Sequence, residues 1–391
     1  MRIVDFGFEH IGAARQIARQ NYETERSFVN MLPPVKEFPD LSRFAENKLG
    51  VAAFEGSVMV GYLCGVSPFN HAFGSTDAVG IFSPMHANGT ITDNRAQIYA
   101  RMYQAAGDKW AKAGASSHAV CLYAHDKAGQ EQFFRYGFGL RCIDAIREMD
   151  KIESQPCHDT GMRCDDGVSR TDKIESQPCN RSGIYSIDAI REMDEIEMQP
   201  CYNTGMRCDD SAQGKNVVET VTKPYCCFEF SELTPEEYIN VLPIDHMLDA
   251  HMAASPTFIL RQSENRASFA DNAARNHSRH FAVKARGRII AFIKIERGGE
   301  TFICETPDYI HINGAYCLPE YRGTGVFQHL LNIVIGTLKG EGYTRLGVDF
   351  ESINPAAYGF WLKYFTAYTH SVTRRIDEHA IGDNKEATKR Q

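Results

Sequence analysis

The sequence predicts a mixed α/β protein built from two similar halves, each a twisted mixed sheet flanked by helices. Three observations support this prediction. Short apolar runs of strand length alternate with amphipathic helices along most of the chain. The order of these elements in the first half returns after residue 225. A chain of 391 residues is also long enough for two or three domains.

In the first half, a strand at 2–6 precedes a helix whose apolar residues, from Ile11 to Ala18, recur at helical spacing. A hairpin follows, because a turn sequence at Gly56 separates two apolar runs. A polar stretch then leads from residue 83 into the next helix. The remaining predicted elements are a helix at 96–114, a buried strand at 118–125, a short helix at 126–138 and a strand at 141–149 at the edge of the sheet.

The second half repeats this order. A strand at 228–233 precedes a largely helical stretch at 235–279, and a hairpin follows that turns at Gly287. The remaining predicted elements are a strand at 309–317, a helix at 325–342, a strand at 345–351, a helix at 355–365 and a closing strand at 366–377. Residues 133–150 align without a gap to residues 360–377. We therefore interpret the chain as a tandem duplication.

Near-identical repeats lie between the halves. Ile143–Asp166 recurs as Ile187–Asp210 with four differences, and a Cys-containing unit returns every 22 residues. Three short, polar, Pro-containing units cannot bury a continuous core, so we expect a duplicated linker rather than a solenoid. Two copies of one strand sequence could then compete for the same place in the sheet. The Cys pairs are seven residues apart, wider than in a zinc knuckle, so a metal or redox role is the less favoured alternative.

These features predict four segments. The predicted segments are a first domain at 1–150, a linker at 151–215, a second domain at 216–378 and a polar tail at 379–391.

Composition and charge exclude several classes of function. The net charge is −8 and no run of Lys and Arg is present, which argues against nucleic-acid binding and is compatible with a cationic small-molecule partner. No stretch of 18 apolar residues predicts a membrane span, and the start lacks the pattern of a signal peptide. Several of the 12 Cys lie in apolar runs, so we expect reduced thiols and a cytoplasmic location. The oligomeric state is left open.

The most informative segment is INGAYCLPEYRGTGVFQHLLN, from Ile312 to Asn332. It predicts a strand, a turn at Pro319, a glycine-containing loop and an amphipathic helix. A loop of this kind at a helix start offers main-chain N–H groups and the positive end of the helix dipole to an anion. Arg322 adds a cation beside it. A tight strand-to-helix turn without a ligand is the alternative.

This segment resembles the GNAT acetyltransferase superfamily, whose signature R/Q-x-x-G-x-G/A binds the pyrophosphate of acetyl-CoA. Arg322 and Gly325 match the first two positions, and Phe327 stands where a small residue is expected. A second segment of the family is matched downstream by Asn354, Ala357, Phe360 and Lys363. The resemblance spans about residues 226–378 and implies two tandem GNAT-like domains. It also implies acetyl transfer from acetyl-CoA to the primary amine of a small molecule or peptide by direct attack, without a metal.

The resemblance further implies which residues contact the cofactor. Main-chain groups of Tyr316, Cys317 and Leu318 would pair with the pantetheine arm and polarise the thioester carbonyl. The other residues implied at the cofactor are Arg322, Gly323, Thr324, Gly325, Val326, Phe327 and Asn354. A covalent role for Cys317 is less favoured, because its place in an apolar strand is typical of packing.

Several residues are candidates for proton transfer. His311 aligns where the family often has a catalytic Glu, and an ordinary His pKa of about 6.5 suits a base, although a structural role in the strand is equally compatible. Glu351 is a second candidate base. Rival carboxylates near strand ends are Glu305, Asp308 and Asp349. Trp361 replaces the family's usual acid, a Tyr, so Tyr364 or Tyr358 would have to act instead.

The first half lacks a comparable loop, and Phe134 occupies the family's Tyr position there. We therefore expect a degenerate copy that supports the second half, shapes its acceptor pocket or binds a different ligand. A non-catalytic acyl-CoA-binding or protein-interaction module is the alternative function, motivated by Phe327 and Trp361.

Overall fold

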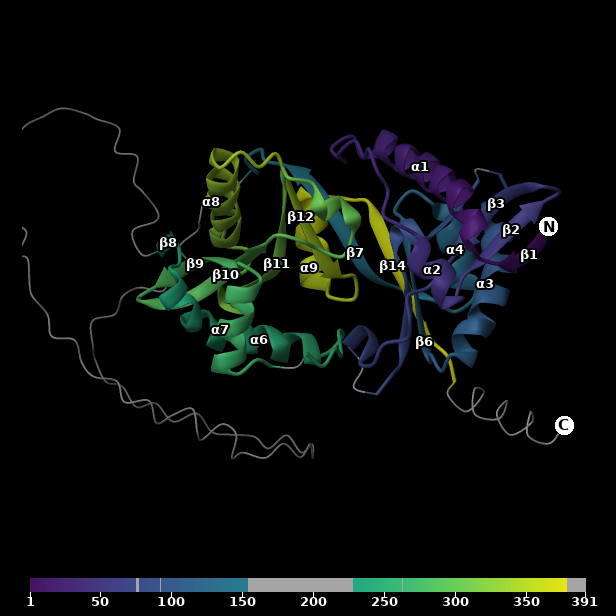
Figure 1. Ribbon diagram of the computed structural model, residues 1–391. Coiled ribbons are helices and arrows are strands. Elements are labelled where there is room, and N and C mark those ends of the chain that lie inside the picture. Colours follow the sequence, from purple (N-terminus) through teal and green to yellow (C-terminus); the bar gives the residue numbers. More distant parts are fainter. Residues whose placement is uncertain (75–76, 92, 154–227, 262, 378–391) are drawn as a thin grey trace, which may run out of the picture. The chain divides into compact units, whose positions relative to one another are not determined.

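The structure is a computed structural model and describes residues 1–74, 77–91, 93–153, 228–261 and 263–377 (Figure 1). The Cys-containing repeats from residue 154 onward, most of the predicted linker and the tail at 379–391 lie outside these residues. Their predicted roles and the predicted domain boundaries therefore stay predictions. The described residues on both sides of the linker belong to one unit.

Apart from α2, β4 and β5, the helices and strands follow the order that the sequence predicts. In the N-terminal half they are β1 (Arg2–Asp5), α1 (Ile11–Phe28), α2 (Ser42–Asn47), β2 (Val51–Glu55), β3 (Val58–Leu63), β4 (Gly80–Ser83), β5 (Asn88–Thr90), α3 (Arg95–Lys112), β6 (Ser117–Tyr123), α4 (Lys127–Arg135) and β7 (Gly139–Glu148). In the C-terminal half they are β8 (Phe228–Glu232), α6 (Leu242–Ala253), α7 (Arg266–Arg275), β9 (Arg279–Ala285), β10 (Arg288–Glu296), β11 (Tyr309–Cys317), α8 (Val326–Gly340), β12 (Arg345–Glu351), α9 (Pro355–Tyr364), β13 (Thr366–Ala367) and β14 (Thr369–Arg375).

Local chemistry explains where several elements begin and how they are buried. The side chains of Asp126 and Asn265 accept hydrogen bonds from first-turn amides of α4 and α7, which satisfies groups that the helix itself cannot. All residues of β6 are buried. This strand therefore appears in the sequence as a continuous apolar run rather than an alternating one.

Two short strands lie where the sequence predicts little structure. β4 ends where the polar stretch from residue 83 begins, and β5 lies within that stretch. Pro84 and Gly89 interrupt the apolar pattern there, which hides the strands. β4 pairs in parallel with β6, and β5 pairs antiparallel with β3. Together they do what β11 does alone in the C-terminal half, where it pairs with both β12 and β10.

The strands form a sheet of four and a sheet of ten. The smaller sheet has the order β1-β2-β3-β5. The larger has the order β4-β6-β14-β7-β12-β11-β10-β9-β8, with β13 paired to β7. Strands of both halves therefore share the larger sheet.

The closing strands of the two halves are exchanged. β14 pairs antiparallel with β6 of the N-terminal half, and β7 pairs antiparallel with β12 of the C-terminal half. In Figure 1 the teal β7 accordingly lies beside the yellow-green β12. The expectation that residues 141–149 lie at a sheet edge is wrong, because β7 lies between β14 and β12. The first copy of the repeated segment, from Ile143, fills this place.

The two exchanged strands also contact each other reciprocally. In the gapless alignment, Gly139 corresponds to Thr366 and Ile146 corresponds to Thr373. Thr366 pairs with Ile146, and Thr373 pairs with Gly139. Each contact is therefore repeated by its equivalent on the other strand, as a local two-fold axis requires. This reciprocity supports the interpretation of the chain as a duplication.

Each exchanged strand also contributes to the core of the opposite half. Val372 of β14 is fully buried in the N-terminal core, which contains Trp110 and Phe133. Ile143 and Ala145 of β7 are buried in the C-terminal core. The stability of each half therefore depends on a strand that the other half supplies.

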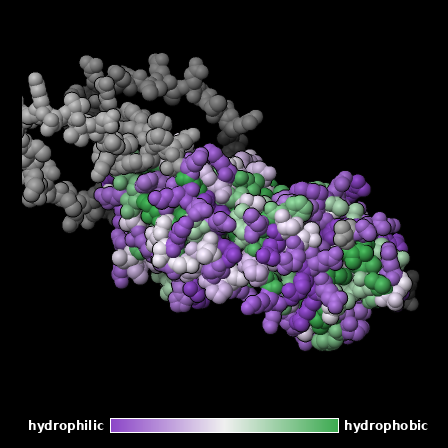
Figure 2. Space-filling view, turned by 90° about the horizontal axis from the view of Figure 1, so that it is seen from above, coloured by the Kyte–Doolittle hydropathy of each residue, from purple (hydrophilic) through white to green (hydrophobic). Residues whose placement is uncertain are grey.

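The surface mixes polar and apolar residues. Figure 2 shows hydrophilic and hydrophobic residues interspersed over the face that it presents. Among the helices that the structure describes, none is long and apolar enough to cross a membrane.

We predict that the two halves unfold together and that Val372→Ala destabilises both. Loss of two buried methyl groups costs about 2 kcal/mol of unfolding free energy. The chain has two tryptophans, Trp110 and Trp361, one in each half. Denaturant unfolding followed by fluorescence of Trp110→Phe and Trp361→Phe variants should give one shared midpoint, and Val372→Ala should lower it in both.

Val58→Ala is the matched control, because Val58 is 63% exposed. This control should change the unfolding free energy by less than about 0.5 kcal/mol. Separate midpoints for the two tryptophans, or a Val372→Ala effect confined to one of them, would contradict the shared sheet.

Candidate active site

The site lies where two parallel strands diverge in the middle of the larger sheet. β11 and β12 pair from Tyr309 and Arg345 as far as Ile312 and Val348. Beyond this point β11 continues against β10, while β12 continues against β7. A bulge in β11 at residues 313–314 marks the divergence. A V-shaped opening results, with an unpaired strand edge on each side.

The bulge requires a glycine. Gly314 has φ of +141°, a conformation that side chains disfavour. A Cβ atom at this position would also lie 3.3 Å from Cε of Lys294. The Asn-Gly dipeptide at 313–314 is therefore the sequence signal for the divergence.

Two adjoining cavities occupy this opening. The smaller, of about 410 Å³, lies between the end of β11, the start of α8 and helix α9. The larger, of about 710 Å³, extends from the opening to residues of the N-terminal half. Residues that line both cavities are Leu248, Ala315, Asn354, Ala357 and Trp361. One molecule in each cavity could therefore meet the other at this junction.

The start of α8 borders the smaller cavity and has free amides. Gly323 and Gly325 have φ of +75° and +86°, so the loop takes a path that favours glycine. Within the described residues, no side chain caps α8. Arg322 donates from Nε to the carbonyl of Cys317 at 3.0 Å, and its guanidinium lies 5.2 Å from the Tyr316 ring centre. The uncapped amides and Arg322 form a positive site for an anion.

The structure places the other loop residues around this helix start. Thr324 is buried and donates from its hydroxyl to the carbonyl of Tyr321 at 2.7 Å, which holds the loop closed. Val326 is fully buried in the core. Phe327 lines the smaller cavity, and its ring packs against Phe360 of α9 at 5.0 Å between ring centres. The aromatic ring therefore takes part in the helix-to-helix contact between α8 and α9.

Main-chain groups of β11 face the opening at every second residue. The amide of Leu318 donates to the carbonyl of Ile290 in β10 at 2.9 Å. Antiparallel pairing alternates, so the amide of Tyr316 also points to β10, whereas the amides of Ala315 and Cys317 point to the opening. The family resemblance implies contacts of Tyr316, Cys317 and Leu318 with the pantetheine arm. Of these three amides, that of Cys317 points to the opening. The amide of Ala315, which the resemblance does not imply, points there as well. Burial raises the pKa of the Cys317 thiol to about 12, which fits a packing role.

Asn354 lies at the junction of the two cavities and caps the N-terminus of α9. Its Oδ1 accepts hydrogen bonds from the amides of Ala356 and Ala357 at 3.2 and 3.3 Å. His251, which sequence reasoning missed, lies 3.4 Å from the same oxygen through Nε2 and lines the smaller cavity. Tyr364 lines this cavity as well.

Residues 245–365, which contain this opening, match the model of the acetyltransferase (GNAT) family. This segment is a GNAT domain. No protein with a curated description matches the chain.

Solved structures similar to the chain include acetyltransferases. A GCN5-related N-acetyltransferase from Sphaerobacter thermophilus is 9% identical, with 95% of each chain covered and a TM-score of 0.48. A tandem GNAT protein from the clavulanic acid biosynthesis pathway is 10% identical, with 95% of this chain and 98% of that chain covered and a TM-score of 0.38. An N-acetyltransferase from Staphylococcus aureus is 17% identical, covers 38% of this chain and 99% of its own, and has a TM-score of 0.29.

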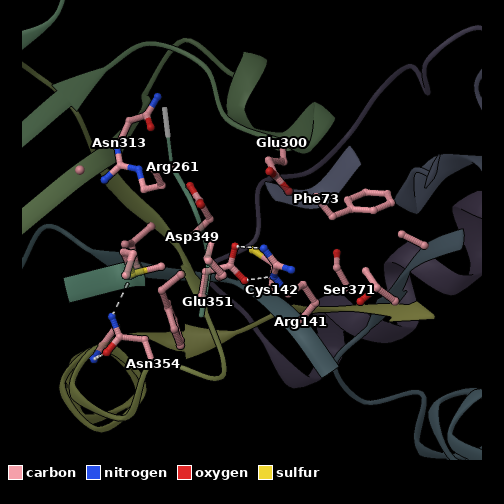
Figure 3. Close-up of a pocket in the computed structure, with 18 of the residues that line it drawn as sticks. Phe73, Arg141, Cys142, Arg261, Glu300, Asn313, Asp349, Glu351, Asn354 and Ser371 are labelled. Atoms are coloured by element: carbon pink, nitrogen blue, oxygen red, sulfur yellow. Dashed lines mark hydrogen bonds and ion pairs between the residues drawn. The ribbon is translucent and has the colours of Figure 1, made fainter. Parts of the chain in front are cut away.

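Acidic side chains line the larger cavity of the GNAT domain. Glu300, Asp349 and Glu351 lie on its wall, and Figure 3 shows Glu300 across the cavity from Asn354. Glu351 forms a two-pronged ion pair with Arg141 of β7, including a 2.9 Å bond from Nη2. Glu351, a candidate base from the sequence, is therefore engaged in an ion pair with Arg141.

His311 is buried and forms a charged pair with Asp349. Its Nε2 lies 2.7 Å from Oδ1 of Asp349, and its Nδ1 lies 2.8 Å from the Tyr309 hydroxyl. Burial alone would lower the pKa of His311, but hydrogen bonds to Asp349 and Cys304 and the Asp349 charge raise it to about 10. His311 is then protonated at neutral pH, where it cannot accept a proton. This arrangement does not fit the expectation of a neutral His base.

The neighbouring glycine makes room for this pair. A Cβ atom on Gly347 would lie 1.6 Å from the Tyr309 hydroxyl oxygen and 2.9 Å from Nδ1 of His311. The contacts among Tyr309, His311 and Asp349 therefore require a glycine at this position of β12.

The carboxylates of the cavity also affect one another. Asp144 of β7 lies directly opposite Asp349 of β12, and burial followed by the Asp349 charge raises the pKa of Asp144 to about 6. Partial desolvation within the cavity, followed by repulsion from Asp144, Asp349 and Glu351, raises the pKa of Glu300 to about 8. The Glu300 side chain stays accessible to solvent within the cavity. No motif in the sequence marks Glu300.

The equivalent helix of the N-terminal half, α3, begins with a cation of its own. Arg95, the first residue of α3, pairs with Asp126 through two nitrogens, with Nε to Oδ1 at 3.0 Å. The same guanidinium donates to the carbonyl of Thr90 and to Oδ1 of Asn21. Side chains and carbonyl groups of its own half therefore hold the Arg95 guanidinium. Among the described residues of both halves, no group of His, Cys, Asp and Glu is arranged to hold a metal.

We predict that His311→Gln changes the pH dependence of stability. The pKa of His311 in the folded protein, about 10, lies above the value of about 6.5 in an unfolded chain. Its protonated form therefore stabilises the fold below pH 6.5, and this contribution is lost as pH rises towards 10. The wild type should exceed His311→Gln by about 2 kcal/mol of unfolding free energy at pH 6 and by progressively less up to pH 10.

Asp349→Asn removes the partner of the same pair, so it should flatten the pH dependence in the same direction. Equilibrium denaturation at a series of pH values measures both variants. A difference from wild type that stays constant or grows with rising pH would contradict the charged pair.

Proposed function

We propose that the GNAT domain is an acyl-CoA-dependent N-acyltransferase, acetyl-CoA being the donor, that acts on a primary amine by direct attack. The observation that carries this proposal is the opening between β11 and β12, with an uncapped helix start and Arg322 at one end and a carboxylate-lined cavity at the other. The donor would occupy the smaller cavity and the acceptor the larger, with the reacting atoms at their shared wall.

The residues of the smaller cavity fit a CoA ester. Amides of residues 323–328 and the Arg322 guanidinium would hold the pyrophosphate. The unpaired main chain of β11 offers hydrogen-bonding groups to an amide-bearing arm. The arm would pair with β11 in the place of a neighbouring strand. The amides of Ala315 and Cys317 would stabilise negative charge on the thioester oxygen. When bound, acetyl-CoA supplies the activated acetyl group.

We assign the acceptor's ammonium to the carboxylates of the larger cavity. Asp349, which contacts His311 at 2.7 Å, would accept a hydrogen bond from the ammonium, and His311 acts as a positioning residue. Glu300 has a pKa near that of a useful base and would take the proton that the amine must lose. Tyr364 is our candidate to protonate the departing thiolate from the smaller cavity. Glu351 would hold Arg141 in place.

We predict that Arg322→Gln weakens acetyl-CoA binding by about 10- to 100-fold, because a charge-assisted contact with phosphate is lost. Isothermal titration calorimetry of the full chain with acetyl-CoA measures the dissociation constant. Arg275→Gln is the matched control, since Arg275 is an exposed residue at the end of α7, away from both cavities. Equal binding by Arg322→Gln and wild type would contradict the assigned loop.

Thiol release from acetyl-CoA in the presence of amines tests the reaction itself. Release with a primary amine supports a transferase. Acetyl-CoA binding without release across a broad panel of amines would favour the non-catalytic acyl-CoA-binding module, which Trp361 at the family's Tyr position motivates. No acetyl-CoA binding at millimolar concentration would remove both.

We predict that Glu300→Gln lowers kcat/KM by about 10- to 100-fold. Since a base acts when deprotonated, wild-type kcat/KM should rise with pH through a midpoint near 8. Without this carboxylate the amine must enter uncharged, so the midpoint in Glu300→Gln should move to the acceptor's own pKa. An unchanged profile would contradict the assignment of Glu300. Steady-state kinetics between pH 6 and 10 measure it.

A further inference from the structure

The larger cavity has an apolar wall that belongs to the N-terminal half. Phe69, Phe73 and Phe82 line it, and their rings form a continuous row. The ring centres of Phe69 and Phe73 lie 5.5 Å apart, and those of Phe73 and Phe82 lie 6.4 Å apart, both in edge-to-face geometry. All three rings are only half-buried, so part of each stays accessible. We call these three residues the phenyl wall.

Main-chain bonds hold the phenyl wall in place. Phe69 exchanges hydrogen bonds with Gly80 of β4 in both directions, at 3.0 and 2.8 Å, and the amide of Ala72 donates to the carbonyl of Ala78. A Cβ atom on Gly80 would lie 2.3 Å from Cβ of Ala72 and 3.1 Å from the Phe73 ring. The glycine therefore lets the segment with Phe69 and Phe73 pack directly on β4, which itself carries Phe82.

The cavity also brings carboxyl groups close to this wall. Glu300 makes no hydrogen bond or ion pair within the described part of the chain, and Figure 3 shows it next to Phe73. Asp349 also lines the cavity. The two arginines of the lining are already neutralised, because Arg141 pairs with Glu351 and Arg261 pairs with Asp249 at 3.3 Å. A ligand here therefore meets carboxylates and phenyl rings side by side.

A buried hydroxyl on the same wall adds a polar point. Ser371 of β14 is 5% exposed, and its Oγ has no hydrogen-bond partner among the described residues. Its polar neighbour is the Cys121 thiol, which is a weak partner. Figure 3 shows the Ser371 oxygen pointing into the cavity. A ligand amine or hydroxyl could satisfy it.

We propose that the acceptor is a hydrophobic primary amine, an ammonium on an aryl or alkyl body, and that the N-terminal half selects it. Its ammonium would lie between Glu300 and Asp349, and its apolar body would lie against the phenyl wall. This inference rests on the proposed transferase function. A cavity of about 710 Å³ accommodates a compact organic molecule of this kind. A sugar amine or a polyamine would leave the phenyl wall without an apolar partner.

The test measures binding and turnover for a matched series of amines with the full chain. The apolar arm is ethylamine, butylamine and 2-phenylethylamine, and the hydrophilic arm is putrescine and glucosamine. Each buried methylene should strengthen binding about three- to fourfold, so 2-phenylethylamine should bind best. Calorimetry gives the binding constants, and thiol release from acetyl-CoA gives kcat/KM.

Phe73→Ala tests the wall itself. It should weaken binding of 2-phenylethylamine about tenfold, while binding of ethylamine and of acetyl-CoA stays within twofold of wild type. Phe73→Leu should recover part of the loss, which separates the role of the side chain from a folding defect. Phe8→Ala is the matched control, because Phe8 lies in the same half and is 58% exposed. It should leave all constants unchanged.

Two results would overturn the proposal. One is equal or tighter binding of the hydrophilic amines. The other is a Phe73→Ala variant that weakens ethylamine and 2-phenylethylamine alike. Thiol release that does not depend on the phenyl wall would support the transferase function and contradict this inference. Selective amine binding without thiol release would do the reverse, since calorimetry does not depend on turnover.

Discussion

Beyond Ile312 and Val348, the pairing between β11 and β12 ends in the middle of the larger sheet. Main-chain groups that lose a partner in a protein interior cost free energy unless something else satisfies them. Here β10 and β7 hold the outer edges of the two strands, so the opening keeps its shape while its inner edges stay available. A ligand with amide groups can complete these edges. The opening therefore exists because pairing between β11 and β12 ends at Ile312 and Val348. The side chains of the site lie around this opening.

The exchange of closing strands gives this frame its support. Because β7 rather than β14 pairs along β12, the N-terminal half forms one side of the opening in the C-terminal half. β7 carries Arg141, which fixes Glu351, and Asp144, which faces Asp349. The chemistry assigned to one half thus depends on charges that the other half supplies. In the N-terminal half, Arg95 at the start of α3 pairs with Asp126 of the same half.

Local sequence signals predicted the elements of the fold and the donor side of the candidate site. The run from Ile312 to Asn332 contains its own strand, glycines and helix start, so its shape depends on neighbours within a few residues. The same holds for Asn354, whose cap role uses the two amides that follow it. Burial and helix period likewise predicted α3, β6 and α8.

The acceptor side could not be predicted in this way, because it forms from residues far apart in the chain. Phe73, Arg141 and Glu300 line one cavity, and Arg141 reaches it through the strand exchange, which no local pattern encodes. The contact between His311 and Asp349 was not predicted for the same reason, since Asp349 lies on a neighbouring strand. β4 and β5 escaped prediction because pairing with β6 and β3, rather than apolar periodicity, makes them strands.

Hydrogen–deuterium exchange of the full chain with and without acetyl-CoA tests the central claim most directly. The inner edge of β11 and the uncapped start of α8 should take up the donor's hydrogen-bonding groups. We therefore expect slower exchange in peptides covering residues 315–328, with little change in those covering residues 88–98 of the N-terminal half. Unchanged exchange at 315–328 with bound acetyl-CoA, or slowing confined to the N-terminal half, would contradict the account.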